Sequence, residues 1–205
     1  MLIFDIGANV GKYSIANCAN NHIIAIEASK IVFSRLIKYV KVYENIIPLN
    51  YAVCNNNNQD ITFYQCDTDC LSTTNIDWLT STTSRFYGQK FSTIKVPTIT
   101  IDSLIEKYGV PDIIKIDVEG GEYDCISSLT QKVSKLSFEW ASETNDITFK
   151  CLDYLHKIGF NNFFIQDKDE YTFNPAENTY TSLETTIQSL SKTKPKKDWG
   201  MIHCM

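Results

Sequence analysis

Asp5-Ile6-Gly7-Ala8-Asn9-Val10-Gly11 comes after only four apolar residues in this 205-residue chain, and it decides the fold. Residues 1–4 are predicted to form a buried parallel strand, and residues 13–19 continue as a helix. The two glycines therefore lie at a strand-to-helix turn, where they permit unusual backbone torsions or a close ligand approach. Ligands of an open parallel sheet bind outside the carboxyl ends of its strands, so we expect Asp5 to face such a crevice.

The spacing of the glycines distinguishes between two adenosyl cofactors. A dinucleotide-binding turn reads G-x-G-x-x-G, and its second glycine makes room for the pyrophosphate. Here Asn9 and Lys12 occupy the second and third glycine positions. An acid before a G-x-N-x-G turn resembles instead motif I of methyltransferases that use S-adenosylmethionine, which carries no pyrophosphate. A turn that needs its glycines for geometry alone is the remaining alternative.

A second predicted strand, residues 23–26, also ends in an acid, Glu27. A carboxylate at this position can accept hydrogen bonds from both ribose hydroxyls of an adenosyl cofactor. This holds for NAD and for S-adenosylmethionine, so Glu27 supports an adenosyl cofactor without choosing between them. A glutamate that opens a surface loop is the alternative interpretation.

Two further segments carry a family resemblance. Residues 96–104 read VPTITIDSL, and residues 111–123 read PDIIKIDVEGGEY. Together with FDIGANVGKYS at the start and AIEAS after the second strand, they resemble the FkbM family of methyltransferases over about residues 2 to 140. The resemblance implies an α/β, Rossmann-like class I methyltransferase fold with a mostly parallel seven-stranded sheet and helices on both faces. It also implies S-adenosylmethionine as the cofactor.

The resemblance and the expected topology indicate where this cofactor binds. The predicted contacts lie at the ends of the first strands, with the adenine beside the third strand: Asp5, Gly7, Asn9, Gly11, Tyr13, Glu27, Ala28, Tyr51, Ala52 and Asp117. The family more often has alanine where this chain has Gly121, and its pattern begins further upstream. Both departures bear on substrate specificity more than on cofactor binding.

Residues 113–117 are predicted to form another strand with alternating side chains. Lys115, Asp117 and Glu119 would project to one side while the chain stays extended. A lysine within an apolar strand needs a partner, and Asp117 is the nearest candidate. A buried ion pair with a purely structural role is the alternative. Gly120 and its neighbour let the chain turn into a helix that begins near Glu122.

Carboxylates beside a sulfonium can take a proton, orient an acceptor or bind a metal. Methyl transfer to oxygen is an in-line displacement, which requires an aligned nucleophile and removal of its proton. We therefore predict four catalytic residues: Lys115, Asp117, Glu119 and Glu139, the last of which ends an apolar strand. Oxygen ligands suit Mg²⁺ or Ca²⁺, but the loop lacks the spacing of an EF-hand, so no metal is predicted.

Residues 65–95 are polar, rich in serine and threonine, and contain interspersed aromatic residues. A long, weakly patterned segment of this kind is typical of a lid or a substrate-binding loop, and a mobile surface excursion is the alternative. Acceptor contacts are predicted from this segment and from the acids after the strand predicted at 113–117: Ser72, Thr73, Glu119 and Glu122.

The length and the 43% hydrophobic content indicate one domain spanning residues 1–205. Further strands are predicted at 46–49, 51–53, 61–64, 163–165 and 199–204, and helices at 31–43 and 149–157. Their alternation is typical of βαβ units. Residues 62–64 break the alternation and are predicted to be an antiparallel addition near the sheet edge.

Composition argues against several other classes of protein. A net charge of −5 disfavours contact with nucleic acid, and the basic segment 192–197 is interpreted as a solvated loop. The seven cysteines do not form a zinc pattern. No apolar run has the length of a signal peptide or of a transmembrane helix, which predicts a cytoplasmic protein without membrane contact.

The sequence thus predicts a methyltransferase that uses S-adenosylmethionine and methylates a hydroxyl of a small molecule, sugar, glycan or secondary metabolite. Two alternatives stay open. One is a protein that binds the same cofactor without turnover, and the other is an NAD-dependent oxidoreductase, which the glycine spacing disfavours. The oligomeric state has no signature in the sequence.

Overall fold

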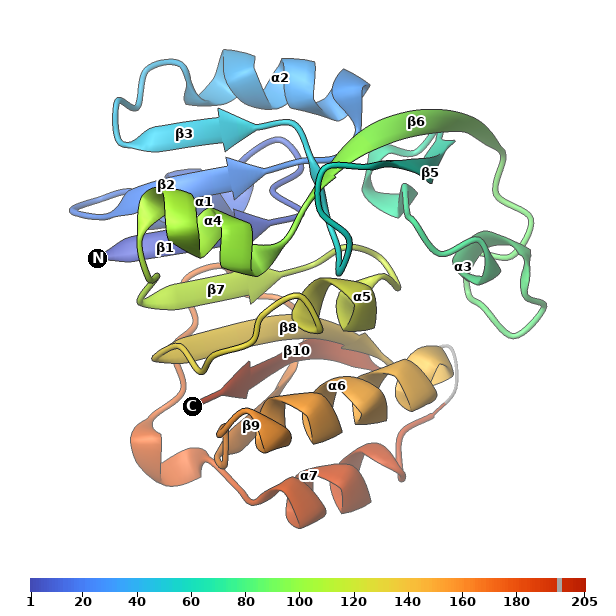
Figure 1. Cartoon of the computed structure of the whole chain (residues 1–205). Helices are drawn as coiled ribbons and strands as arrows, with labels where there is room; N and C mark the ends of the chain where they lie inside the picture. Colours follow the sequence, from blue (N-terminus) through green and yellow to red (C-terminus); the bar gives the residue numbers. More distant parts are fainter. Residues whose placement is uncertain (195–196) are drawn as a thin grey trace.

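A computed structural model describes residues 1–194 and 197–205. Part of the basic segment, Pro195 and Lys196, lies outside the described residues. The main sheet has seven strands in the order β3-β2-β1-β7-β8-β10-β9, and only β10 runs antiparallel to its neighbours (Figure 1). The strands are β1 (Leu2–Ile6), β2 (His22–Ile26), β3 (Ile46–Leu49), β7 (Ile113–Ile116), β8 (Lys135–Ala141), β9 (Phe163–Asp167) and β10 (Trp199–Cys204). This architecture is the predicted one.

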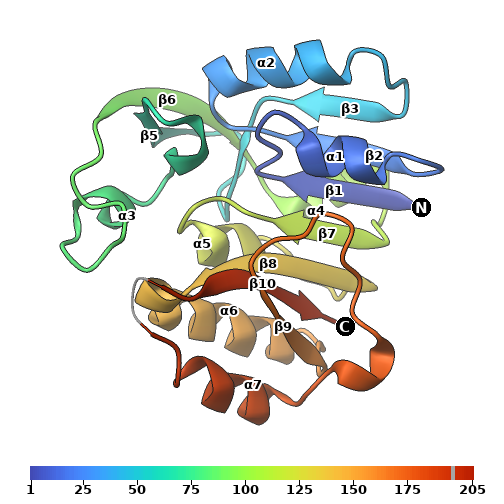
Figure 2. The same cartoon turned by 180° about the vertical axis from the view of Figure 1, so that it is seen from behind.

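Helices cover both faces of the sheet, as Figures 1 and 2 show from opposite sides. They are α1 (Lys12–Asn17), α2 (Lys30–Val40), α4 (Ile101–Tyr108), α5 (Glu122–Ile126), α6 (Asn145–Lys157) and α7 (Leu183–Leu190). On one face, Leu104 of α4 and Leu152 of α6 belong to the core cluster that contains Phe4. On the other face, Leu36 of α2 packs in a cluster with Ile3. Burial on both faces explains why the parallel strands are almost continuously apolar.

The half of the second face beside β9 and β10 is covered by an extended segment instead of a helix. This segment, residues 168–180, runs over the sheet in Figure 2 and contains the short helix η3 (Glu177–Thr179) at its end. Phe173 stacks on Phe164 of β9 with ring centroids 5.6 Å apart. Gly200 of β10 allows the backbone at the end of β9 to approach closely, because a Cβ at this position would lie 2.0 Å from the backbone oxygen of Gln166.

A second, three-stranded sheet stands at the carboxyl ends of the parallel strands (Figure 1). It consists of β4 (Ala52–Val53), β5 (Asp60–Cys66) and β6 (Phe91–Ile99), with β6 in the middle. The antiparallel character predicted for residues 62–64 is therefore confirmed, but their place at the edge of the main sheet is wrong. They pair with β6 of this smaller sheet, and Tyr64 also forms a bridge with Thr73 of the connection that follows.

The polar insert is shorter than predicted, because both of its ends belong to strands β5 and β6. The connection itself, residues 67–90, contains η1 (Asp69–Leu71) and α3 (Asp77–Thr80). Its apolar side chains, among them Trp78 and Leu79, pack in a small cluster that also includes Ala141 of β8 and Trp199 of β10. A last short helix, η2 (Ser142–Thr144), precedes α6. None of the helices in the described residues is long and apolar enough to cross a membrane.

Candidate functional site

A cavity of about 540 Å³ opens at the carboxyl ends of β1, β2 and β7. Its volume lies within the roughly 300–1,000 Å³ that is usual for small-molecule sites. The small sheet and residues 68–74 of the connection form its opposite wall. The lining includes eleven of the predicted site residues: Gly7, Asn9, Tyr13, Glu27, Ala28, Tyr51, Ala52, Ser72, Lys115, Asp117 and Glu119.

The glycine turn after β1 is forced by close packing against the end of β7. Gly7 has φ +78°, and a Cβ there would lie 1.7 Å from the backbone oxygen of Asp117. Asn9 also adopts a left-handed conformation, with φ 49°, which asparagine tolerates better than most residues. Gly11 lies at the start of α1 and packs against Leu36 below the cavity, where it does not contribute to the lining.

Asp5 does not face the crevice openly, in contrast to our expectation. Its side chain is completely buried beneath the turn, where Oδ2 accepts a hydrogen bond of 2.6 Å from Ser14. Its Oδ1 lies 3.9 Å from Nζ of Lys115 and has no hydrogen-bond partner in the described part of the chain. Burial raises the pKa of Asp5, although the Lys115 ammonium opposes this change. Asp5 therefore does not line the cavity, and its charge influences the cavity through the neighbouring Lys115 ammonium.

Lys115 is 4% exposed and links the buried acid to the cavity. Its Nζ donates to Oδ2 of Asp117 at 3.0 Å, as the sequence predicted. Burial disfavours its charge, but Asp117 and Asp5 more than compensate and raise the pKa of Lys115 above its usual value. The lysine is therefore a permanently charged group at neutral pH.

Glu27 holds the end of β2 against the glycine turn. Its Oε2 accepts the N–H of Asn9 at 3.0 Å, and its Oε1 accepts the N–H of Ser29 at 2.8 Å. Burial raises the pKa of Glu27 to about 7, because the apolar surroundings penalise its charged form. The carboxylate is thus fixed in direction and lies at the wall where the sequence predicts the ribose of an adenosyl cofactor.

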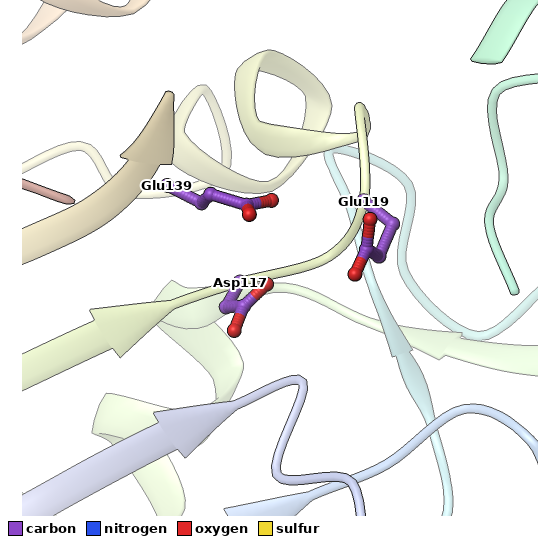
Figure 3. Close-up of side chains that lie close together, drawn as sticks. All are labelled: Asp117, Glu119 and Glu139. Carbon is purple, nitrogen blue, oxygen red and sulfur yellow. The ribbon is translucent and has the colours of Figure 1, made fainter. Parts of the chain in front are cut away.

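Three carboxylates meet beside the cavity, as Figure 3 shows. Asp117 follows β7, Glu119 lies on the next turn, and Glu139 points toward them from within β8. One oxygen of each lies within 4.8 Å of the others, and we call these residues the acid cluster. Burial and mutual repulsion raise the pKa of Glu119 and Glu139 well above the usual value. Such a group can share protons, or its oxygens can bind a hard divalent cation.

Two predicted acceptor residues instead support the backbone around Glu119. Glu122 accepts the N–H groups of Val118 and Gly120, each at 3.2 Å, and it does not line the cavity. Burial raises its pKa to about 7. Thr73 is buried and donates its hydroxyl to the backbone oxygen of Glu119 at 2.6 Å.

The cavity also contains residues that sequence reasoning missed. Among them are Lys12, Arg35, Tyr39, Val53, Phe63, Thr68, Cys70, Thr74, Val118 and Tyr171. Thr68, Cys70, Ser72 and Thr74 recur at every second position around η1, and this spacing could have indicated a wall of small side chains, although the backbone between Thr68 and Ser72 is helical and not extended. Tyr171 has no such local signal, because it arrives from the segment that covers the sheet.

Comparison with known proteins identifies the family. A sequence profile described as the methyltransferase FkbM domain matches residues 5–162, which is more than half of the chain. This chain belongs to the FkbM methyltransferase family. The cofactor of FkbM methyltransferases is S-adenosylmethionine, in agreement with the sequence prediction.

Known relatives agree with this assignment. Hexuronic acid methyltransferase AglP from Haloferax volcanii is 24% identical over 140 residues, or 67% of this chain. The alignment spans about half of that relative, 53% of its length.

Among solved structures, precorrin-6Y C5,15-methyltransferase from Geobacter metallireducens has a TM-score of 0.52 and 12% identity, covering all of this FkbM chain and 79% of that one. Precorrin 8w decarboxylase from Methanobacterium thermoautotrophicum has a TM-score of 0.50 and 8% identity, covering all of this chain and 81% of that one. These likenesses confirm the class I methyltransferase fold.

Proposed function

We propose that this FkbM-family chain transfers a methyl group from S-adenosylmethionine to a hydroxyl of a sugar, a glycan or a secondary metabolite. The observation that carries the proposal is the acid cluster at the wall of a cavity built on the glycine turn. The cavity residues fit the cofactor, because the lining offers a carboxylate fixed in direction, Glu27, for the ribose and an ion pair, Lys115 with Asp117, for the charged methionine end. When bound, S-adenosylmethionine supplies an activated methyl group on its sulfonium.

Residues at the ends of β2 and β7 and at the start of β4 bind and orient the cofactor. Glu27 accepts hydrogen bonds from the ribose hydroxyls, since its carboxylate is fixed by two backbone donors and lines the cavity. Tyr51 and Ala52 border the adenine. Lys115 and Asp117, which face the cavity as an ion pair, border the methionine end.

The acid cluster removes the proton of the acceptor. Asp117 is paired with the Lys115 ammonium and orients the hydroxyl. Glu119, whose pKa is raised by burial and by its acidic neighbours, takes the proton as the methyl group transfers. Glu139 lies behind them and holds a proton, because burial and its acidic neighbours raise its pKa. We propose that this proton, with no metal ion, lowers the charge of the cluster and leaves Glu119 ionised to act as the base.

The base explains why we favour a hydroxyl acceptor. A hydroxyl must lose a proton during transfer, whereas an ionised carboxylate has none to lose and is repelled by three acids. The relative AglP is named as a hexuronic acid methyltransferase, which supports a carbohydrate acceptor. Thr68, Ser72 and Thr74 line the same cavity with small hydroxyl side chains, which can bind a polyhydroxylated molecule.

A panel of acceptors tests the proposal. The purified protein and S-adenosylmethionine are incubated with methyl glycosides of neutral hexoses and deoxyhexoses and with free hexuronic acids, and S-adenosylhomocysteine and methylated products are measured by mass spectrometry. We expect a methyl ether on a neutral sugar, and Asp117→Asn should lower turnover far more than it lowers cofactor affinity. A methyl ester on a hexuronic acid alone would reject the hydroxyl acceptor. Full turnover by Asp117→Asn would reject its role.

A further inference from the structure

The turn that carries Glu119 is in an unfavourable conformation. Glu119 has φ 56° and Gly120 has φ +89°, so two successive residues are left-handed. A residue with a side chain rarely adopts this region unless its surroundings hold it there. The position of the Glu119 carboxylate therefore depends on the groups that bond to this turn.

Three residues of the connection 67–90 bond directly to the turn. Thr73 Oγ1 donates to the backbone oxygen of Glu119 at 2.6 Å, and Asn75 Nδ2 donates to that of Gly120 at 3.0 Å. Trp78 Nε1 donates to Oε2 of Glu119 at 3.1 Å. The connection thus holds the backbone carbonyl groups of Glu119 and Gly120 and also the Glu119 carboxylate itself.

Thr73 and Trp78 are themselves fixed. The backbone of Thr73 exchanges two hydrogen bonds with Tyr64 of β5, of 2.8 and 3.0 Å. Trp78 is 3% exposed, and its ring lies 5.2 Å from that of Phe86, measured between centroids. The hydroxyl of Ser84 donates to the backbone oxygen of Trp78 at 2.6 Å.

An ion pair fastens the far end of the connection to the main sheet. Arg85 donates through Nε and Nη2 to the two carboxylate oxygens of Glu143. Its Nη2 also donates to the backbone oxygen of Asp198, next to β10, at 3.1 Å. Both ends of the connection are therefore anchored, and Trp78 lies between the anchors.

We propose that Trp78 is a positioning residue for methyl transfer, and that its indole N–H aims the Glu119 carboxylate at the acceptor hydroxyl. The connection 67–90 then works as a rigid arm of the active site and not as a mobile lid. This inference rests on the proposed function of Glu119 as the base. A small displacement of a catalytic group is enough to slow a reaction severely, which is why such an arm matters.

A matched pair of tryptophan variants tests the proposal. Trp78→Phe removes the donor and keeps an aromatic ring. The control Trp140→Phe makes the same change at a residue that is also 3% exposed and whose Nε1 has no hydrogen-bond partner among the described residues. Trp140 packs in the large core cluster around α6.

We expect Trp78→Phe to lower kcat by about tenfold or more relative to Trp140→Phe, because a misplaced group can cost up to about 100-fold. The KM for S-adenosylmethionine should be the same in both variants. A purely structural role would lower the thermal midpoint of Trp78→Phe but leave its kcat, measured well below that midpoint, equal to that of Trp140→Phe. Equal kcat values would overturn the proposal.

A spectroscopic measurement makes the contact visible without turnover. The indole N–H signals of ¹⁵N-labelled protein are assigned with the two variants and then recorded in Glu119→Gln. We expect the Trp78 signal to move and the Trp140 signal to stay, and an unmoved Trp78 signal would overturn the proposal. If the unmodified protein methylates nothing in the acceptor panel, the proposed function fails, while the indole signals still decide whether Trp78 holds Glu119.

Discussion

The pH dependence of cofactor binding follows from the environment of Glu27. With a pKa of about 7, this carboxyl is ionised in about half of the molecules at pH 7, in roughly a tenth at pH 6 and in roughly nine tenths at pH 8. Only the ionised form accepts hydrogen bonds from two ribose hydroxyls through both oxygens. We therefore expect the affinity for S-adenosylhomocysteine to rise about tenfold between pH 6 and pH 8, which corresponds to about 1.4 kcal/mol.

The stability of the free protein changes in the opposite direction. Folding raises the pKa of Glu27 above its ordinary value of 4.5, so the folded state holds the proton more tightly than the unfolded chain. The stability that this residue contributes is therefore present in acid and is lost as the pH rises from about 4.5 through about 7. Bound ribose hydroxyls offset this loss, because they stabilise the ionised form.

Calorimetric titrations from pH 6 to pH 8 measure the effect, with Glu27→Gln as the comparison. Glu122 titrates in the same range, and Asp5 and Asp117 also contribute to the field at Glu27, so only the variant assigns the effect to Glu27. Glu27→Gln should bind about 10- to 100-fold more weakly at pH 8, from the loss of hydrogen bonds to a charged group of about 1.5–3 kcal/mol. An unchanged pH dependence in this variant would refute the reasoning.

Three further results are expected. Gly7→Ala should abolish cofactor binding and lower the thermal midpoint. The new Cβ would lie 1.7 Å from the backbone oxygen of Asp117, and the left-handed φ of this position adds a cost of about 1–2 kcal/mol. Normal binding would show that the turn does not need its close packing against the end of β7. Lys115→Met should lower the free energy of unfolding at pH 7 by about 3–5 kcal/mol, measured in urea, because it leaves buried Asp5 without its cation; a smaller loss in acid is expected, where Asp5 is protonated. Turnover should be the same in EDTA as in Mg²⁺, and turnover that requires Mg²⁺ would place an ion in the acid cluster.

Local chemistry explains what the sequence could predict. Gly7 and Glu27 are recognisable because the backbone torsions of a strand-to-helix turn and the end of a buried strand each demand particular residue types. Parallel strands end at the same edge of the sheet, so acids that follow different strands were expected to meet there. The pairing of Lys115 with Asp117 followed from the two-residue period of a strand.

Tertiary contacts explain what the sequence could not predict. Nothing in the sequence indicates that β5 pairs in a separate sheet, because its partner β6 lies beyond a polar connection. The direction of a polar side chain is equally hidden: Thr73 and Glu122 were predicted to bind the acceptor, and both bond to the backbone of the Glu119 turn. Tyr171 reaches the cavity because its segment crosses the sheet and its backbone oxygen accepts a hydrogen bond from Asn17.

The departure at Gly121 has a steric counterpart in this chain. A Cβ at this position would lie 2.8 Å from Oγ1 of Thr74, so the threonine fills the space that an alanine would use. The glycine at position 121 therefore makes room for Thr74 of the connection 67–90. It does not affect the glycine turn after β1.

A calorimetric titration of the purified protein with S-adenosylmethionine, S-adenosylhomocysteine and NAD tests the central claim most directly. The account predicts that the first two bind at one site per chain and that NAD gives no heat of binding. Binding of NAD alone, or of none of the three, would contradict the assignment of the cavity to S-adenosylmethionine.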